Sequence, residues 1–177
     1  MSTISEFKAQ MAFGGARPNQ FRVELGFPAF LSGSVNAAGY AGYFLCKSAT
    51  LPASTVEDIT TFYRGRPVHF AGERTFAPWT VNVLNDNNFL IRNIMETWSN
   101  QIANYSTTNG MIAPSMYMAG MMTVYQLDRN DTPIKSYTFY DVYPIMVGQI
   151  GLDFDQNNQI ETFDVEFMYN YFVASNV

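Results

Sequence analysis

Few side chains in this 177-residue sequence could do chemistry, since it holds one histidine, His69, and one cysteine, Cys46. A single cysteine excludes an intrachain disulfide and a cysteine-rich zinc site, and a single histidine excludes a two-histidine metal site within the chain. A nucleophilic mechanism would have to use His69, yet no nucleophile or orienting acid stands near it in the sequence. We therefore expect His69 to be an ordinary strand residue and Cys46 a small core residue.

Carboxylates gather in the last quarter of the chain. Asp164 and Glu166 are two residues apart and would share one face of a strand, as the paired acids of a glycosidase could. The solvated face of an antiparallel sheet shows the same alternation, and we favour that interpretation. The run that begins at Asp153 resembles a calcium-binding loop but lacks the glycine at its sixth position and the glutamate at its twelfth. We expect no catalytic residue, no cofactor and no bound metal.

Two arginines flank a glycine in the segment Arg64-Gly65-Arg66-Pro67. This segment lacks the lysine that marks a phosphate-binding loop. We interpret it as a polar hairpin tip that meets an acidic surface of a partner, and a plain solvated turn is the alternative.

The composition favours a protein that covers much of its surface with partners. Charged residues make up 14% of the chain and aromatic residues 16%, and 10 basic against 15 acidic side chains give a net charge of −5. Large apolar surfaces usually mark interfaces, whereas an acidic balance argues against tight wrapping of nucleic acid. No apolar run approaches the roughly 18 residues of a membrane span, and the first ten residues lack a signal-peptide pattern. We expect a protein that is made and kept in a reducing cytosol, without membrane insertion.

The elements that must position these residues are mostly strands. Alternation of apolar and polar residues predicts strands at 21–25, 43–46, 68–70, 79–83, 123–127 and 136–142, then a hairpin of 150–155 with 162–171. One helix is expected at about 88–102, with Leu90, Ile94 and Trp98 on its apolar face and capping side chains before it. Residues 1–16 form an arm, 32–39 a loop of small residues and 52–67 a long polar excursion. The fold class is mainly β: an antiparallel sandwich or barrel with one flanking α-helix and extended loops.

Short segments in a fixed order carry a resemblance to a known family. They are Ala16-Arg17-Pro18-Asn19, Cys46-Lys47-Ser48-Ala49-Thr50-Leu51-Pro52-Ala53, Arg66, Ala71-Gly72-Glu73-Arg74-Thr75-Phe76, Trp79-Thr80-Val81, Asn85-Asp86, Trp98, Tyr143-Pro144, Val147-Gly148, Leu152-Asp153-Phe154-Asp155 and Asn158-Gln159-Ile160-Glu161-Thr162-Phe163. Over about 17–172 the sequence resembles the tail tube proteins of T4-like contractile phages. It departs from them in a longer segment at 32–42, in a Met-rich stretch at 111–122, and in Phe154 and Phe172 where tryptophan is expected.

This resemblance implies a structural virion protein rather than an enzyme, with a tube domain at 17–177 after the arm. Six subunits would form a ring in which four strands from each join into one inner barrel, and the rings would stack into a tube inside a contractile sheath. The implied partners are further copies of the chain, the tail sheath protein, and the baseplate, tape-measure and tail-terminator proteins. Double-stranded DNA would pass through the lumen during genome ejection without tight binding.

Within this picture the residues suggest two kinds of surface. The excursion at 52–67 is expected to protrude toward the next ring, with the arm as a second candidate, and the expected inter-subunit contacts are Tyr63, Arg64, Arg66 and Met118. Arg64 and Arg66 would pair with acids of an adjacent subunit. Asp164 and Glu166 would line the lumen, where negative charge keeps DNA from sticking. The alternatives are a tube protein of a related contractile injection system and a carbohydrate-active or sugar-binding β-sandwich.

Overall fold

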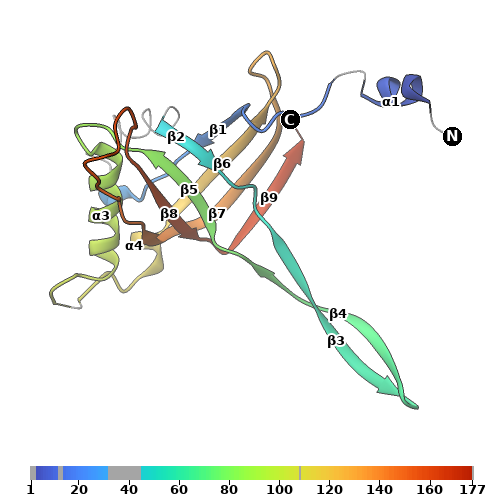
Figure 1. Ribbon diagram of the computed structural model, residues 1–177. Helices are drawn as coiled ribbons and strands as arrows, with labels where there is room; N and C mark the ends of the chain where they lie inside the picture. Colours follow the sequence, from blue (N-terminus) through green and yellow to red (C-terminus); the bar gives the residue numbers. More distant parts are fainter. Residues whose placement is uncertain (1–2, 12–13, 32–44, 108, 177) are drawn as a thin grey trace.

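The computed structural model describes residues 3–11, 14–31, 45–107 and 109–176, so the small-residue loop expected at 32–39 lies outside the described residues. These residues form a mainly antiparallel β body, one helix packed against it and a long hairpin that projects from it (Figure 1). The predicted fold class is therefore confirmed.

The body is a seven-stranded sheet in which one long strand belongs to two halves. Its order is β1 (Phe21–Glu24), β6 (Ala119–Leu127), β7 (Pro133–Val147), β8 (Thr162–Met168), β5 (Trp79–Leu84) and β2 (Cys46–Ala49), and β9 (Tyr171–Asn176) also pairs with β7. Residues 135–140 of β7 pair with β9, whereas residues 143–147 pair with β8. We call β1, β6, β9 and the first part of β7 sheet A, and β2, β5, β8 and the last part of β7 sheet B.

The strand predicted to end before Pro144 continues to Val147. Proline cannot donate to a ladder, but a register shift between Pro144 and Met146 lets the strand carry it. This irregularity lies just after β7 passes from sheet A to sheet B, within the segment that pairs with β8.

The hydrophobic core lies between the two sheets. Trp79 of β5 stacks on Phe139 of β7 with ring centroids 4.3 Å apart, and Phe167 of β8 lies 5.5 Å from Trp79. Every second residue of β5 and β8 is buried, as predicted from their alternation, which adds Val81, Val83, Phe163 and Val165 to the core. Full burial of such a side chain stabilises a fold by about 1.5–3 kcal/mol.

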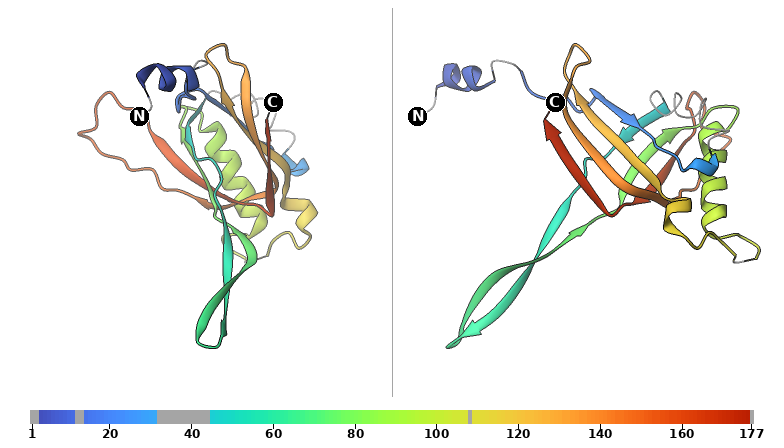
Figure 2. Two further views of the ribbon diagram at one scale, coloured as in Figure 1. Left: turned by 90° about the vertical axis from the view of Figure 1, so that its right-hand side faces the viewer. Right: turned by 180° about the vertical axis from the view of Figure 1, so that it is seen from behind.

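The helix α3 (Leu90–Ile102) packs against β7 and covers one end of the core (Figure 2). Its buried side chains follow helical spacing, at Ile91, Ile94, Met95 and Trp98. The helix begins at Leu90, where the Asp86 carboxylate accepts a hydrogen bond of 2.9 Å from the Leu90 amide. The predicted helix at about 88–102 is thus confirmed to within two residues, although its N-cap residue is Phe89, which provides no side-chain cap.

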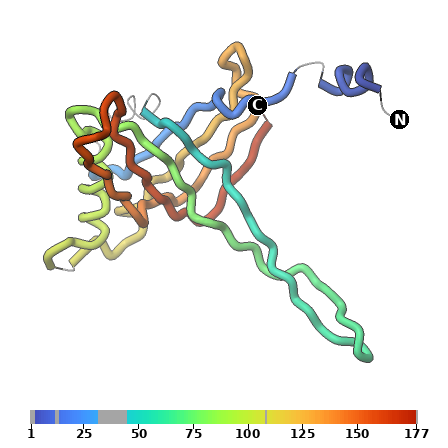
Figure 3. The backbone as a smooth tube through the Cα atoms, viewed as in Figure 1, coloured from blue at the N-terminus to red at the C-terminus, as the bar shows by residue number. Residues whose placement is uncertain are grey.

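Residues 52–67 are not the irregular excursion that the sequence suggested. Strands β3 (Ser54–Tyr63) and β4 (Arg66–Phe76) form a twisted two-stranded hairpin that projects from the body on the side away from α3 (Figure 3). The two turn residues, Arg64 and Gly65, have φ of 48° and 83°, as a type I′ hairpin turn requires. Both faces of β3 are exposed, so its sequence does not alternate between apolar and polar residues as that of a half-buried strand does.

Residues 150–155 were predicted as a strand, and this prediction was wrong. Residues 151–161 are all exposed and form the loop between β7 and β8, so β8 pairs with β5 and β7 instead. Asp153 accepts hydrogen bonds from the Asp155 and Gln156 amides, one on its side chain and one on its carbonyl. A local turn of this kind competes with a strand ladder.

The arm holds one regular element. Helix α1 (Ile4–Gln10) is exposed along its length and stands apart from the body (Figure 2). A capping box starts it: Thr3 accepts from the Glu6 amide while Glu6 accepts from the Thr3 amide. Two short helices complete the fold, η1 (Ala29–Leu31) and α4 (Pro114–Tyr117).

Candidate assembly surfaces

The projecting hairpin has one largely apolar face and one mixed face, which carries Asp58, Thr60 and His69 together with the exposed Phe62. Cross-strand pairing puts Ile59 opposite Phe70 and Thr61 opposite Val68. Ile59 and Phe70 are each 55% exposed, although cross-strand neighbours cover part of them. We call this face the hairpin stripe: Ile59, Thr61, Tyr63, Val68 and Phe70. Continuous exposed apolar surface of this kind marks an interaction site.

The mixed face of the hairpin brings His69 to an acid that sequence reasoning missed. His69 Nδ1 lies 2.7 Å from the Asp58 carboxylate, and Thr60 donates to the same carboxylate oxygen at 2.7 Å. Because a carboxylate only accepts, the Nδ1 atom carries the proton. The hydroxyl proton points at the acid rather than at a free ring nitrogen, so the group lacks the order of a catalytic triad.

This constellation could have been found by counting from the turn. Placing the hairpin turn at Arg64 and Gly65 pairs Thr60 with His69. In the same unbroken register Asp58 pairs with Ala71, so Asp58 lies diagonally opposite His69 on the same face of the hairpin. The two hydrogen bonds lower the pKa of the Asp58 carboxyl below its ordinary 3.8, that from Thr60 more than that from His69.

The hairpin tip gathers three of the four predicted contact residues. Arg64 lies over the Tyr63 ring at 5.4 Å, and Arg66 pairs with Tyr63 across the strands. In the described part of the chain neither arginine makes an ion pair within 4.0 Å. Met118 is elsewhere: it is half-buried between α4 and β6 on the body, and the structure does not bring it to the tip.

Sheet A ends in two edges. Over the described residues, β1 hydrogen-bonds only to β6 and β9 only to β7. Strand β9 reads Tyr171-Phe172-Val173-Ala174-Ser175-Asn176 and contains no charged residue and no proline. Charges and prolines are the usual means by which a protein blocks addition of a further strand. The outer edge of β9 is therefore open to another chain.

Asp164 and Glu166 lie on β8 and point away from the core, because Phe163, Val165 and Phe167 between and beside them are buried. The prediction that the two acids share a face is consistent with this alternation. Asn82 of the neighbouring strand donates to Asp164 at 2.7 Å, and Thr80 is opposite Glu166. Both acids belong to sheet B.

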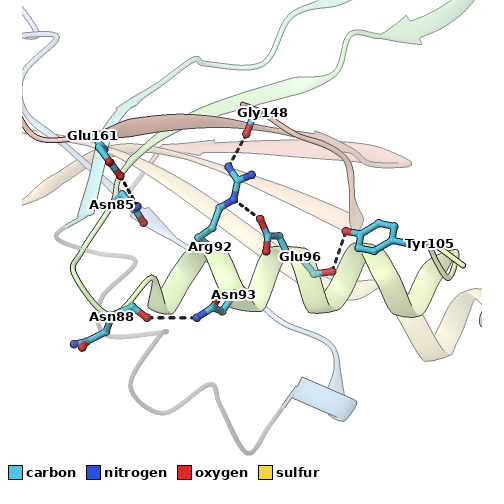
Figure 4. A network of polar contacts seen from close by, with 8 residues as sticks. All are labelled: Asn85, Asn88, Arg92, Asn93, Glu96, Tyr105, Gly148 and Glu161. Carbon is cyan, nitrogen blue, oxygen red and sulfur yellow. Dashed lines mark hydrogen bonds and ion pairs between the residues drawn. The ribbon is translucent and has the colours of Figure 1, made fainter. Parts of the chain in front are cut away.

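A polar network joins α3 to the ends of the β7–β8 loop (Figure 4). The Arg92 guanidinium donates to the Glu96 carboxylate and to the Gly148 carbonyl, while Asn85 donates to Glu161 at 3.0 Å. Arg92 also lies over the Phe163 ring at 5.0 Å. The loop itself exposes Leu152, Phe154 and Ile160, with exposed fractions of 81%, 105% and 69%. Among the described residues, this loop is a second exposed apolar surface beside the hairpin stripe.

The described residues offer little support for nucleophilic catalysis, a metal site or a membrane span. Burial raises the pKa of the Cys46 thiol to about 12, so it is a poor nucleophile. Across the ranges that the structure describes, no three His, Cys, Asp or Glu side chains are grouped as metal ligands. The helices in those ranges are all too short or too polar to cross a bilayer.

Comparison with known proteins decides the family. The sequence pattern of the phage tail tube protein family matches residues 16–175. The chain belongs to this family. It is 31% identical over 156 residues to tail tube protein gp19 of Enterobacteria phage T4, which covers 88% of this chain and 90% of gp19. It is 26% identical over 171 residues to the tail tube protein of Serratia phage KSP90, covering 96% of this chain and 95% of that one.

Solved structures share the tail tube fold. The chain superposes on a protein of the sheath–tube complex of an extracellular contractile injection system with a TM-score of 0.63, 11% identity and full coverage of both chains. A protein of the tube-terminating cap of the anti-feeding prophage gives a TM-score of 0.67 at 13% identity, with 92% of each chain covered. The resemblance drawn from the sequence is confirmed, and this tail tube protein is a structural component and not an enzyme.

Proposed function

We propose that this tail tube protein is the subunit of the inner tube of a contractile-tailed phage. Six copies form a ring, rings stack into a hollow tube, and genomic DNA passes through it into the host. The observation that carries the proposal is the open, uncharged edge of β9 at one end of sheet A, with β1 at the other end. An edge at each end lets one sheet continue from copy to copy.

Ring closure follows from a head-to-tail contact between these edges. Strand β9 of one copy lies beside β1 of the next, so four strands from each of six copies join into one barrel without free edges. A head-to-tail contact closes into a ring when its rotation divides a full turn evenly. The backbone groups on the outer edge of β9 become hydrogen-bonded in the barrel.

Stacking of the rings needs a second contact, one that repeats along the tube axis instead of closing into a ring, and the hairpin supplies it. The hairpin stripe docks on a copy in the adjacent ring, while Arg64 and Arg66 pair with acids there. The protruding inter-ring segment thus extends beyond the 52–67 expected from the sequence, to the whole of β3 and β4. The arm at 1–16, with Ile4 and Phe7 exposed on α1, is a second inter-ring contact. Met118, on the body, is an inter-subunit contact candidate of its own.

The remaining partners follow from the place of the tube in a virion. The outer wall meets the sheath protein, and the ends meet the baseplate and tail-terminator proteins, as the similar folds in solved sheath–tube, tube-terminator and baseplate assemblies suggest. A tape-measure protein and then DNA occupy the lumen, and assembly takes place in the host cytoplasm. A phage is favoured over another injection system because gp19 of phage T4 is 31% identical, against 11% for the injection-system protein.

A proline pair tests the role of the β9 edge. Amides of adjacent strand residues point to opposite sides, so of Val173→Pro and Ala174→Pro one removes an amide that faces β7 and the other an amide on the open edge. The open-edge variant should keep its thermal stability yet form no tubes in negative-stain microscopy. The variant that loses the amide facing β7 should unfold at a lower temperature than the wild-type protein. Wild-type protein that stays monomeric at high concentration, or a stable open-edge variant that forms normal tubes, would overturn the proposal.

A further inference from the structure

We propose that helix α1 of one copy docks on the hairpin stripe of a copy in the adjacent ring, so that two apolar surfaces exposed in the single chain cover each other in the tube. This inference rests on the proposed stacking of rings. It names the segment that meets the hairpin stripe, and it makes the arm and the hairpin two sides of one contact instead of two separate contacts.

Helix α1 presents one apolar row. Ile4, Phe7 and Met11, the last at the C-cap, are three and four residues apart and therefore lie on one side of the helix. They are 76%, 67% and 46% exposed, and no residue of α1 is buried. A helix of seven residues needs a packing partner, because isolated helices shorter than about 12–15 residues are marginal in water. The described body of the same chain is not that partner, since α1 stands apart from it (Figure 2).

The hairpin of the same chain lies at the opposite end of the body. The arm leads into Phe21, which aligns through β6 with Lys135 near the start of β7. The hairpin leads into Trp79, which aligns through β8 with Pro144 near the end of β7. The strand from Lys135 to Pro144 is about 30 Å long, and the hairpin points away from α1 (Figures 1 and 2). When rings stack in one orientation, the hairpin end of each copy therefore faces the arm end of a copy in the next ring.

The base of the hairpin holds the hairpin stripe in a fixed direction. Phe76, the last residue of β4, has its ring centroid 5.8 Å from that of Tyr169 and 5.6 Å from that of Phe172. Strand β3 has ten residues and extends about 34 Å, so the hairpin reaches well beyond its own body. The hairpin stripe is thus presented to the next ring at a defined place.

The two apolar surfaces match in length and in charge. The hairpin stripe runs about 14 Å along β3 from Ile59 to Tyr63, and the row on α1 is about 10 Å long. Lys8 stands beside the α1 row, and Glu57 precedes Ile59 by two residues. Among the described residues neither Lys8 nor Glu57 forms an ion pair within 4.0 Å. A cation at the edge of one surface and an acid at the edge of the other favour one register of docking.

Disulfide crosslinking of assembled tubes tests the contact. In a Cys46→Ser background, Phe7→Cys places a thiol on the α1 row and Phe70→Cys places one on the hairpin stripe. Each copy then offers its arm thiol and its hairpin thiol to different neighbours along the tube, so oxidation should give covalent ladders of many more than six subunits. Phe7→Cys with Phe62→Cys, on the mixed face of the hairpin, is the matched control and should remain monomeric on a denaturing gel.

The length of the ladder separates the outcomes. A contact within one ring would close at six subunits, and a contact within one chain would leave monomers. Either result in normally formed tubes would overturn the inference and leave the proposed tube intact, whereas wild-type protein that forms no tubes would overturn the proposed function itself. Ile4→Cys with Val68→Cys repeats the measurement if the first pair does not assemble.

A double-mutant cycle tests whether the arm and the hairpin stripe form one contact. Phe7→Ala and Phe70→Ala should each raise the subunit concentration needed for tube growth roughly tenfold, because each removes an apolar anchor. If these two side chains pack on each other, the double variant should raise the concentration little further, and an increase of roughly a hundredfold would show independent contacts and overturn the inference. Phe154→Ala, on the exposed β7–β8 loop, is the matched control and should leave the concentration unchanged.

Discussion

Trp79 of β5 and Phe139 of β7 lie face to face, 19° from parallel, and so join sheet B to sheet A at the centre of the core. The Trp79 indole also donates to the Thr50 carbonyl at 2.9 Å. Thr50 lies four residues before β3, so the same side chain holds both the body and the chain that leads into the projecting hairpin.

Removing the ring of Phe139 should cost about 3–5 kcal/mol in the free energy of unfolding, because Phe139→Ala leaves a cavity between the sheets. Ser175→Ala, at an exposed position of the edge strand, should change it by less than about 0.5 kcal/mol. Urea denaturation of the monomer measures both. A loss below about 1 kcal/mol for Phe139→Ala would show that the sheets do not depend on this stack.

Reversing the charge at the hairpin tip should separate folding from assembly. Arg64→Glu with Arg66→Glu leaves every described ion pair and the core intact, so the unfolding free energy should move by no more than about 0.5 kcal/mol. The variant should sediment as a soluble subunit that forms no tubes, whereas Arg129→Glu, on an exposed turn of the body, should polymerise. If the tip variant formed normal tubes, the hairpin tip would not be part of the stacking contact.

The Asp58 group should respond to acid. Its pKa is lowered in the folded hairpin, so its contribution to hairpin stability is complete above the ordinary 3.8 and is lost as the pH falls through the lowered value. An NMR titration of the Asp58 carboxyl should give a midpoint below 3.8. Thr60→Val should raise that midpoint more than His69→Ala does, since the Thr60 hydrogen bond is the larger cause. Equal midpoints in all three proteins would mean that the hydrogen bonds do not form in solution.

Arg92 should matter for the order of the β7–β8 loop. Arg92→Met leaves the Gly148 carbonyl and the Glu96 carboxylate without this donor, at a cost of about 1–3 kcal/mol. Arg92→Lys should recover only part, because an ammonium cannot reproduce a planar fork that serves two acceptors. Hydrogen exchange should quicken in 148–161 and remain unchanged in β6, and uniform exchange across the chain would contradict this role.

The buried body was predictable from the sequence, and the exposed elements were not. In β5 and α3 one face is buried and the other wet, so the residue pattern shows the period of the element. In the β3–β4 hairpin of a single chain both faces are exposed, so its sequence shows no period-two alternation of apolar and polar residues. Ile150, Leu152 and Phe154 alternate like a strand but have no strand beside them. Ile150 packs against the core, whereas Leu152 and Phe154 are exposed and are not positioned by the core of their own chain.

The candidate surfaces were also predictable only in part. Tyr63, Arg64 and Arg66 were predictable as a group because a turn keeps neighbours in sequence together in space. The Asp58–His69 contact follows once the turn at Arg64 and Gly65 is recognised. The two edges of sheet A depend on which distant strands pair, and the alternation within each strand does not show that pairing. Met118 was chosen from a Met-rich run, but methionine also fills gaps beside a core, and here it is half-buried on the body.

The hairpin contributes almost nothing to the core of its own chain, so damage to it escapes the checks that remove misfolded protein. A subunit with an intact body and a defective hairpin would still join a ring, but that ring would not bind the next ring. Expressed beside the normal protein, it should act as a dominant inhibitor that leaves short, capped tails, and its potency should grow with the sixfold repetition of each ring.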